Sequence, residues 1–268
     1  MCWRQSNVAE GESDEGAARL AGETLVIALM PTIVLLHGFT QTRQSWRRTT
    51  AALGGRYRAL APDLPGHGMA AERRPASFAA CAAYVRALAD VPIVLAGYSM
   101  GGRIALYTAL TMPDLVHRLV LVGASPGIGD AAEREERRRA DAALADRIET
   151  MDIAAFASEW GAQELFAGQE PRVAAAAHAD RLRNTPAGLA AALRGLGTGI
   201  MPPLWDRLGE LAMPVTLVTG ERDAKFRAIA GRMATAIRDC RVEVVDGAGH
   251  AAQLEEPGIV AAAIRGTP

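Results

Sequence analysis

The stretch Val91-Pro-Ile-Val-Leu-Ala-Gly-Tyr-Ser-Met-Gly-Gly-Arg103 joins an apolar run to a helix-forming run through the motif Gly-x-Ser-x-Gly. Ile93 to Ala96 is typical of a buried strand, and Ile104 to Leu110 is typical of a helix. Between a strand and a helix, this motif predicts a sharp turn that exposes the hydroxyl of Ser99. Its two glycines lack Cβ atoms, so the strand and the helix can approach each other closely. The alternative is an ordinary glycine-rich connection.

Length and composition limit the class of protein. The chain has 268 residues, half of them hydrophobic, which is enough for one large α/β domain with an insertion. A net charge of -1 does not favour nucleic acid or an acidic membrane as a partner. Three widely spaced cysteines suit a reducing compartment and show no metal-site spacing. The apolar run Leu25 to Ile33 is too short to span a bilayer and follows an acidic stretch, unlike a signal peptide. We therefore expect a cytoplasmic protein; nothing indicates its oligomeric state.

Apolar runs of strand length alternate with helical patterns along most of the chain. This alternation predicts an α/β fold with a mostly parallel sheet flanked by helices. The predicted strands cover residues 32–36, 57–61, 93–96, 119–122, 215–219 and 241–245. The predicted helices around them cover residues 45–53, 77–89, 104–110, 226–237 and 257–265.

Residues 128–202 differ from the rest because they contain helical patterns and no strand pattern. A block of helices between two strands predicts a helical cap inserted over the ligand-binding edge of the core. Pro202-Pro203 would return the chain to the core. The predicted organisation is a loose leader over 1–22, a core over 23–127 and 203–268, and a cap over 128–202. An early strand is expected over residues 24–30.

Ser99, Asp223 and His250 each follow a predicted strand at its carboxyl end, where open α/β sheets place their sites. Their order along the chain is that of the α/β-hydrolase triad. We expect His250 to accept the proton of Ser99, and Asp223 to fix the imidazole tautomer and stabilise its charge. Glu221 and Asp246 are alternatives to Asp223. Asp223 is favoured because it lies a few residues beyond its strand, in a glycine-containing turn.

The loop His37-Gly-Phe-Thr40 follows the first buried strand. We expect the backbone N–H of Phe39 and that of Met100 to form an oxyanion hole. The alternative for Phe39 is a plain strand-exit turn. His37 is expected to orient this loop through a hydrogen bond. His67 is an alternative base to His250, but its place between two glycines favours a role in bracing a loop.

These motifs resemble the α/β-hydrolase superfamily across residues 30 to 265, and within it the menaquinone-pathway family of 2-succinyl-6-hydroxy-2,4-cyclohexadiene-1-carboxylate synthases. The elbow around Ser99 and the His-Gly loop are shared by the whole superfamily. The more specific matches lie in the predicted cap: Glu133-Arg-Glu-Glu-Arg-Arg-Arg-Ala-Asp141, Arg181-Leu-Arg-Asn-Thr-Pro-Ala-Gly-Leu189 and Leu193-Arg-Gly-Leu-Gly-Thr-Gly199. Further matches are Gly220-Glu-Arg-Asp-Ala-Lys-Phe226 and Gly247-Ala-Gly-His250. The N-terminal leader departs from the family pattern.

The resemblance implies a lyase that eliminates pyruvate from a succinyl-cyclohexene precursor with several carboxylates. It implies no metal or cofactor. The serine of that family acts as a triad-activated base and is not acylated. The resemblance also implies that three arginines hold substrate carboxylates and that Tyr98 lies in the binding site. By motif position, these arginines are Arg103, Arg137 and Arg181.

Physical chemistry supports two interpretations of these arginines. Guanidinium groups suit carboxylates in bidentate geometry, and Arg103 lies one turn into the helix after the elbow. Conversely, Glu133 and Arg137 are spaced i,i+4, as on a solvated helix face. The triad alone also permits a serine esterase or a C–C bond hydrolase, since fold does not fix function. A ligand receptor without catalysis is a further class, disfavoured by the complete triad.

Overall fold

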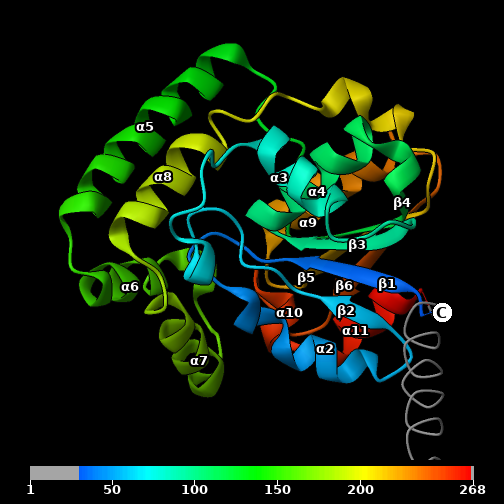
Figure 1. Cartoon of the computed structure of the whole chain (residues 1–268), viewed down its shortest axis with the longest axis horizontal. Helices are drawn as coiled ribbons and strands as arrows, with labels where there is room; N and C mark the ends of the chain where they lie inside the picture. Colours follow the sequence, from blue (N-terminus) through cyan, green and yellow to red (C-terminus); the bar gives the residue numbers. More distant parts are fainter. Residues whose placement is uncertain (1–29, 267–268) are drawn as a thin grey trace, which may run out of the picture.

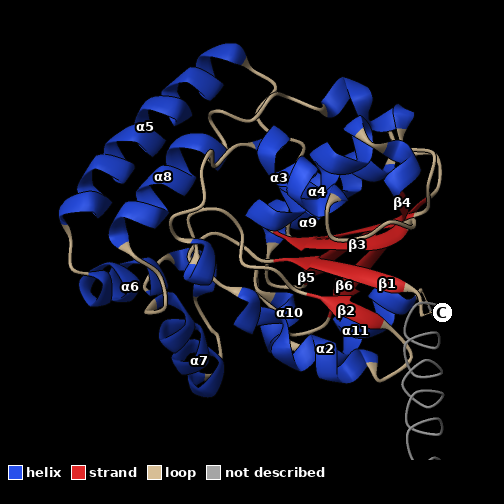
Figure 2. Cartoon of the chain, in the orientation of Figure 1, coloured by secondary structure: helices blue, strands red, loops and turns tan. Residues whose placement is uncertain are grey.

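The computed structural model describes residues 30–266, so the predicted leader and residues 24–29 of the expected early strand lie outside the described residues. Its centre is a six-stranded sheet in the order β2-β1-β3-β4-β5-β6 (Figure 2). All neighbouring strands are parallel, which confirms the predicted α/β architecture. The strands are β1 (Thr32–Leu36), β2 (Arg58–Leu60), β3 (Ile93–Tyr98), β4 (Val116–Val122), β5 (Val215–Gly220) and β6 (Cys240–Val245).

Several elements differ from the prediction at their boundaries, and two of these differences have a local cause. The predicted helix over 45–53 is a 3-10 turn, η1 (Arg43–Trp46), followed by α2 (Arg47–Leu53). The turn begins two residues early because the Thr42 side chain accepts a hydrogen bond from the Gln44 N–H. β4 begins three residues before the predicted position, because Val116 still pairs with β3.

Helices cover both faces of the sheet. On one face lie α2, α10 (Ala252–Glu255) and α11 (Pro257–Arg265), and on the other lie α3 (Phe78–Arg86), α4 (Met100–Thr111) and α9 (Ala224–Ala234) (Figure 1). β1 shows why both faces are covered. Ile33 and Leu35 join one buried cluster, Val34 and Leu36 join the other, and all four are fully buried.

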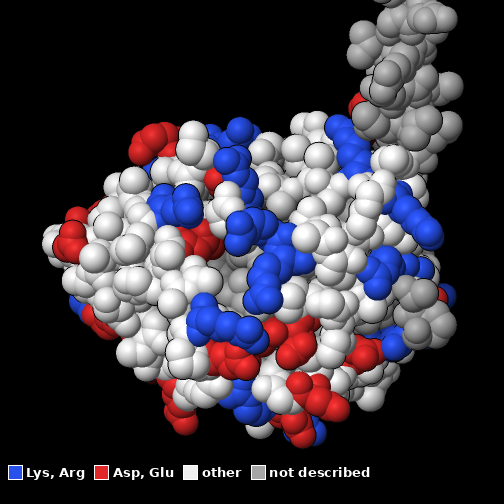
Figure 3. All heavy atoms as spheres, turned by 90° about the horizontal axis from the view of Figure 1, so that it is seen from below, with Lys and Arg blue, Asp and Glu red and all other residues white. Residues whose placement is uncertain are grey.

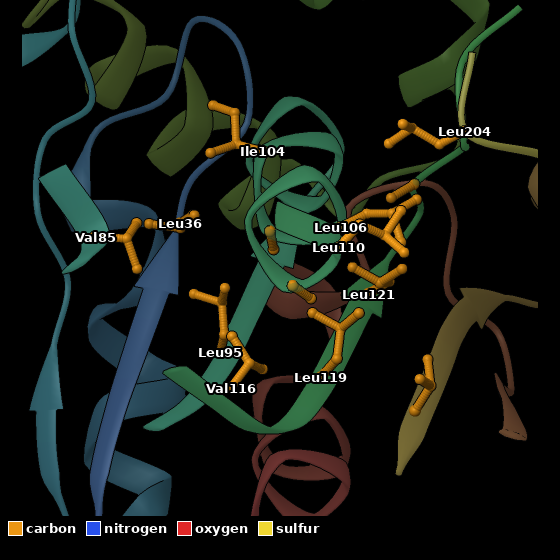
Figure 4. Close-up of a cluster of buried hydrophobic side chains, with 14 of the residues drawn as sticks. Leu36, Val85, Leu95, Ile104, Leu106, Leu110, Val116, Leu119, Leu121 and Leu204 are labelled. Carbon is orange, nitrogen blue, oxygen red and sulfur yellow. The ribbon is translucent and has the colours of Figure 1, made fainter. Parts of the chain in front are cut away.

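Figure 4 shows how α4 is fixed to the sheet. Ile104 and Leu106 of this helix belong to the same buried cluster as Leu95 of β3 and Leu121 of β4. Burying each such side chain contributes about 1.5–3 kcal/mol. The start of α4, directly after Ser99, is therefore held firmly at the carboxyl end of β3.

Four helices lie between β4 and β5 in the chain: α5 (Ala131–Thr150), α6 (Ile153–Gly161), α7 (Pro171–Arg181) and α8 (Pro186–Leu196). Figure 1 shows them together at one side of the sheet. Leu189 and Phe156 belong to a separate apolar cluster among these helices, and Phe39 of the β1 exit loop packs against it. Within residues 30–266, every helix is too short or too polar to cross a membrane.

Candidate active site

The turn between β3 and α4 holds Ser99 in a strained conformation, with φ of 50° and ψ of -107°. An L-residue rarely adopts this region, which costs about 1–3 kcal/mol. The two glycines of the motif make the turn possible. A Cβ on Gly97 would collide with the carbonyl of Gly101, and a Cβ on Gly101 would collide with the carbonyl of Leu36. The local sequence therefore folds as a nucleophile elbow, with Ser99 partly exposed.

Loops after three strands bring Ser99, His250 and Asp223 together. His250 Nε2 lies 3.3 Å from Ser99 Oγ, and His250 Nδ1 lies 2.6 Å from Asp223 Oδ2. His250 and Asp223 are buried. The second oxygen of Asp223 accepts a hydrogen bond from the Phe226 N–H and so caps α9. This geometry lets the imidazole take the serine proton while the carboxylate fixes its tautomer.

The two alternative acids lie elsewhere. The Glu221 carboxylate accepts a hydrogen bond from the Gly247 N–H at 2.9 Å, and the Glu221 side chain is exposed. Asp246 is also exposed. Asp223 is thus the carboxylate that contacts the imidazole of His250.

Aromatic rings surround the imidazole of His250. The ring centroid of Phe226 lies 4.5 Å from it, that of Tyr98 5.3 Å and that of Phe166 6.5 Å. Burial raises the pKa of the Tyr98 hydroxyl, so it stays protonated. Sequence reasoning missed Phe166 and the role of Phe226. The position of Phe226 could have been inferred from the sequence, because it lies in the first turn of the helix that Asp223 caps. The position of Phe166 could not, because it reaches the site from η4 (Glu164–Phe166), among the inserted helices.

The two predicted oxyanion donors flank the elbow. Met100 is the first residue of α4, and the first N–H groups of a helix have no acceptor in a preceding turn. The Phe39 N–H donates to no acceptor within residues 30–266. Both N–H groups are therefore available to a developing negative charge.

His37 and His67 brace the loop that carries Phe39. His37 Nε2 accepts from the Leu64 N–H at 2.9 Å, and His67 Nε2 accepts from the Thr40 N–H at 3.3 Å. Burial lowers the pKa of both histidines, and that of His67 lies well below its usual value. Each ring is neutral and acts as an acceptor. His67 braces a loop, as its place between two glycines predicted.

Arg181, at the end of α7, is buried beside the triad. Its guanidinium carbon lies 5.1 Å from the ring centroid of Phe166, and Gly161 leaves room for one of its terminal nitrogens. Its side chain forms no hydrogen bond within the described part of the chain, and its Nε is fully buried. Burial lowers the pKa of Arg181, but an arginine remains charged at neutral pH. A buried cation without a hydrogen-bond partner is costly unless an anion joins it.

Arg103 and Arg137 form a second group, around the carboxyl end of α8. Arg103 is buried and donates to the carbonyl of Leu196 at 2.7 Å, and burial lowers its pKa to about 10. Arg137 Nε donates to Asp141 at 2.7 Å, and 46% of its side chain is exposed. The Asp141 carboxylate also accepts from the Gly199 N–H. The structure thus brings Tyr98 and Arg181 to the triad, whereas Arg103 points to α8.

The surface carries both signs of charge. In Figure 3, basic side chains border much of a central hollow, and acidic side chains lie along one side of it. Residues 30–266 contain no group of three or more His, Cys, Asp or Glu side chains arranged to hold a metal ion.

A Ser-His-Asp set at the carboxyl ends of a parallel sheet, with the serine on a strained elbow, defines the class of α/β hydrolases. The chain belongs to the alpha/beta hydrolase family, whose sequence profile matches residues 33–263.

Within that family, two relatives similar in sequence carry the same enzyme name. A relative from Bacillus subtilis (strain 168) is 37% identical over 84% of this chain and 85% of its own, and is provisionally named 2-succinyl-6-hydroxy-2,4-cyclohexadiene-1-carboxylate synthase. A relative from Escherichia coli O1:K1 carries that name outright, at 34% identity over 87% of this chain and 92% of its own. The solved structure of MenH from S. aureus superposes with a TM-score of 0.82, at 32% identity over 88% of this chain and 92% of that one. These likenesses confirm the resemblance that the motifs indicated.

Proposed function

We propose that this protein is a lyase of menaquinone biosynthesis that eliminates pyruvate from a succinyl-cyclohexene carboxylate and forms 2-succinyl-6-hydroxy-2,4-cyclohexadiene-1-carboxylate. The names of its relatives support this reaction. The observation that carries the proposal is the buried guanidinium of Arg181, which has no hydrogen-bond partner within residues 30–266 and lies beside a bonded Ser-His-Asp set. A substrate with several carboxylates can satisfy that cation in bidentate geometry, whereas a neutral ester cannot.

In this proposal Ser99 is a base. His250 accepts the hydroxyl proton of Ser99 while Ser99 Oγ takes a proton from the carbon next to the succinyl ketone, and Asp223 stabilises the imidazolium. The electrons of the broken C–H bond pass to the ketone oxygen. The N–H groups of Phe39 and Met100 stabilise the resulting negative charge. The electrons then return to the ring, the existing ring double bond shifts, a second one forms, and the ring C–O bond breaks. The enolpyruvate leaves with the electrons of that bond, receives the proton held by the imidazolium of His250 and becomes pyruvate, which leaves Ser99 and His250 in their starting states.

The helices between β4 and β5 would act as a cap that selects the substrate by charge. We assign Arg181 and Tyr98 to the carboxylate nearest the triad, because both line the space around His250. Arg137 binds Asp141 through Nε, so its terminal nitrogens are the groups that would reach a second carboxylate. Arg103, buried against α8, would contribute positive charge to that second position. The proposed boundaries of the cap remain residues 128–202.

An ester or C–C bond hydrolase is the second candidate. The 3.3 Å approach of Ser99 Oγ to His250 Nε2 would also serve a nucleophilic serine, and the same two N–H groups would hold a tetrahedral intermediate. The two candidates differ in one respect. A nucleophilic serine becomes acylated and gives a burst of leaving group, whereas a basic serine does not.

The deciding experiment uses one preparation and two substrates. Pyruvate release from the succinyl-cyclohexene precursor should be far faster than cleavage of an activated ester such as p-nitrophenyl acetate, and the ester should give no burst. Ser99→Ala is the control for contaminating enzymes and should abolish pyruvate release. A strong ester burst without pyruvate release would reject the lyase and leave the hydrolase.

A further inference from the structure

Residues 180–184 form the end of α7 and the turn after it. Their side chains form hydrogen bonds with the loop that carries Phe39. The Asp180 carboxylate accepts hydrogen bonds from the Thr42 N–H at 2.9 Å and from the Thr42 hydroxyl at 2.5 Å. The Asn184 amide donates to the carbonyl of Thr40 at 2.8 Å. These contacts join residues about 140 positions apart in the chain, from the inserted helices to the exit of β1. We call residues 180–184 the α7 end turn.

The gripped loop has a strained backbone. Thr40 has a φ of 67°, and within residues 30–266 it shares a positive φ with only one other non-glycine residue, Ser99. A β-branched residue in this region is a genuine outlier and persists only where its surroundings hold it. His67 holds the N–H of Thr40, and Asn184 holds its carbonyl. The hydrogen bond to His67 ties Thr40 to the core, and the hydrogen bond to Asn184 ties it to the α7 end turn.

The hydrogen bonds of the Asp180 and Asn184 side chains all go to other groups of the protein. Asn184 is buried, and besides Thr40 its amide donates to the Arg181 carbonyl and accepts from the Gly68 N–H. It thereby joins the Phe39 loop, the loop of His67 and the α7 end turn. Asp180 is also buried, and its nearest cation is Arg183, at 3.8 Å. Both residues are committed to positions in the loop rather than to solvent.

Arg181 lies between these two residues in the same turn, and its guanidinium lies over the ring of Phe166, which neighbours the imidazole of His250. We infer that Asp180 and Asn184 are positioning residues: through the α7 end turn, they fix the direction of the Phe39 N–H. This inference rests on the proposed function, in which Phe39 is an oxyanion donor and Arg181 a carboxylate partner. One helical turn then sets both the substrate position and the geometry of the oxyanion hole.

A purely structural role predicts a different result from a positioning role. Ordinary tertiary hydrogen bonds affect the melting temperature and the amount of folded enzyme, but not the turnover of the enzyme that is folded. A misplaced oxyanion donor lowers kcat, because a displacement of about 1 Å or the loss of one donor costs about 10²-fold or more. KM reports substrate binding and changes little, since Arg181 is untouched.

The test therefore separates kcat from KM in matched variants. Asn184→Asp keeps the size of the side chain but replaces the donor to Thr40 with a carboxylate oxygen. We expect it to lower kcat for pyruvate release about 10- to 100-fold, with KM changed less than about threefold. Thr42→Val removes one hydrogen bond to Asp180 and should lower kcat about three- to tenfold, whereas Thr42→Ser keeps the hydroxyl and should restore it. Arg172→Ala, in the exposed ion pair with Glu170 at the start of α7, is the control and should match the wild type.

Failure of this inference is distinct from failure of the proposed function. If the wild type releases pyruvate while Asn184→Asp and Thr42→Val keep kcat within twofold, the positioning role is wrong and the lyase stands. If the wild type releases no pyruvate, the lyase is wrong. The same variants are then compared on the activated ester, whose hydrolysis needs the same two N–H donors. A selective loss of kcat there supports the positioning role, and unchanged kcat rejects it. If Asn184→Asp fails to fold, the Thr42→Val and Thr42→Ser pair decides.

Discussion

In the core of the molecule the imidazole of His250 bonds to both Asp223 and Ser99, whereas in the inserted helices the guanidinium of Arg181 is buried with no hydrogen-bond partner within residues 30–266. The core residues satisfy one another before any substrate arrives. Arg181 forms no such bond within the described residues, so its hydrogen-bond partners must be water or a ligand that enters the site. In the proposed reaction this difference divides the work between the two regions: the core would supply the proton-transfer machinery, and the inserted helices would supply the charge that selects an anionic substrate.

Removing the core machinery should have the largest effect. Ser99→Ala and His250→Ala should each lower kcat by about 10³-fold or more, because members of a triad act as a unit. Steady-state pyruvate release measures this loss, and circular dichroism checks that the variants are folded. If either variant kept more than about a tenth of the wild-type activity, the machinery would not lie in this triad.

The acid of the triad comes next. Asp223→Asn should lower kcat about 10²- to 10⁴-fold, because the amide favours the wrong imidazole tautomer. Glu221→Gln is the matched control, since Glu221 bonds to the Gly247 N–H and does not contact the imidazole. We expect that control to stay within about threefold of the wild type. Reversed results for the two variants would move the acid to Glu221.

On the other side of the comparison, Arg181→Ala tests the charge supplied by the inserted helices. A charged hydrogen bond contributes about 1.5–3 kcal/mol, so kcat/KM should fall roughly 10- to 150-fold, mainly through a higher KM. We expect the upper part of that range because Arg181 is buried. Arg181→Lys keeps the charge but loses the bidentate fork, and should recover part of the loss. Unchanged KM in Arg181→Ala would show that the substrate does not reach this cation.

The same comparison explains how much of the molecule could be predicted from the sequence. The elbow was predictable because its causes are local: the Ser99 turn needs glycines two residues away on each side. The triad was predictable because each member follows a strand, and parallel strands end at one edge of the sheet. The helices between β4 and β5 were also predictable, because residues 128–202 are rich in helix-forming residues and contain no strand pattern. α8 begins at Pro186, because this residue takes the first helical position after the Thr185 cap.

Contacts between distant segments were not predictable in this way. The hydrogen bonds from Asp180 and Asn184 to the Phe39 loop depend on how α7 packs against the core, and no spacing in the sequence encodes that packing. Likewise, Arg103 lies one turn after the elbow, but its guanidinium donates a hydrogen bond to the carbonyl of Leu196. Local position placed Arg103 near the site, and tertiary packing decided where it points.

The buried histidines of the core should make stability depend on pH. His37 and His67 are neutral when folded, with pKa values below the usual 6.5, so the unfolded chain binds more protons below about pH 6.5. Stability should therefore be constant above that pH and fall as the pH drops towards the folded pKa values, by up to about 1.4 kcal/mol per pH unit for each histidine. The negative charges of Asp63 and Asp180 oppose the lowering of the His37 pKa. His67 should therefore account for the larger part of the dependence of stability on pH.

Urea unfolding at pH 7.5 and pH 5.5 measures this slope. His67→Gln removes the more strongly shifted group, and the difference in stability between the two pH values should shrink even if the variant is less stable at both. A wild type equally stable at pH 7.5 and pH 5.5 would contradict neutral, buried histidines. The two histidines of the core are buried as neutral rings, whereas Arg181 is buried as a cation.

The smallest effect is expected at Arg137, which sharpens the comparison within the inserted helices. Arg137 is half exposed and already paired with Asp141, so solvent screens it and a substrate carboxylate must compete with that partner. Arg137→Ala should lower kcat/KM by about tenfold at most. Asp141→Asn separates the two readings of this residue. If Arg137 binds substrate, freeing it from Asp141 should leave KM unchanged or lower, while Arg137→Ala raises KM. If the pair only braces α5 against the turn at Gly199, both variants should lower the melting temperature and neither should change KM. That second pattern would leave Arg181 as the arginine of the inserted helices that recognises the substrate.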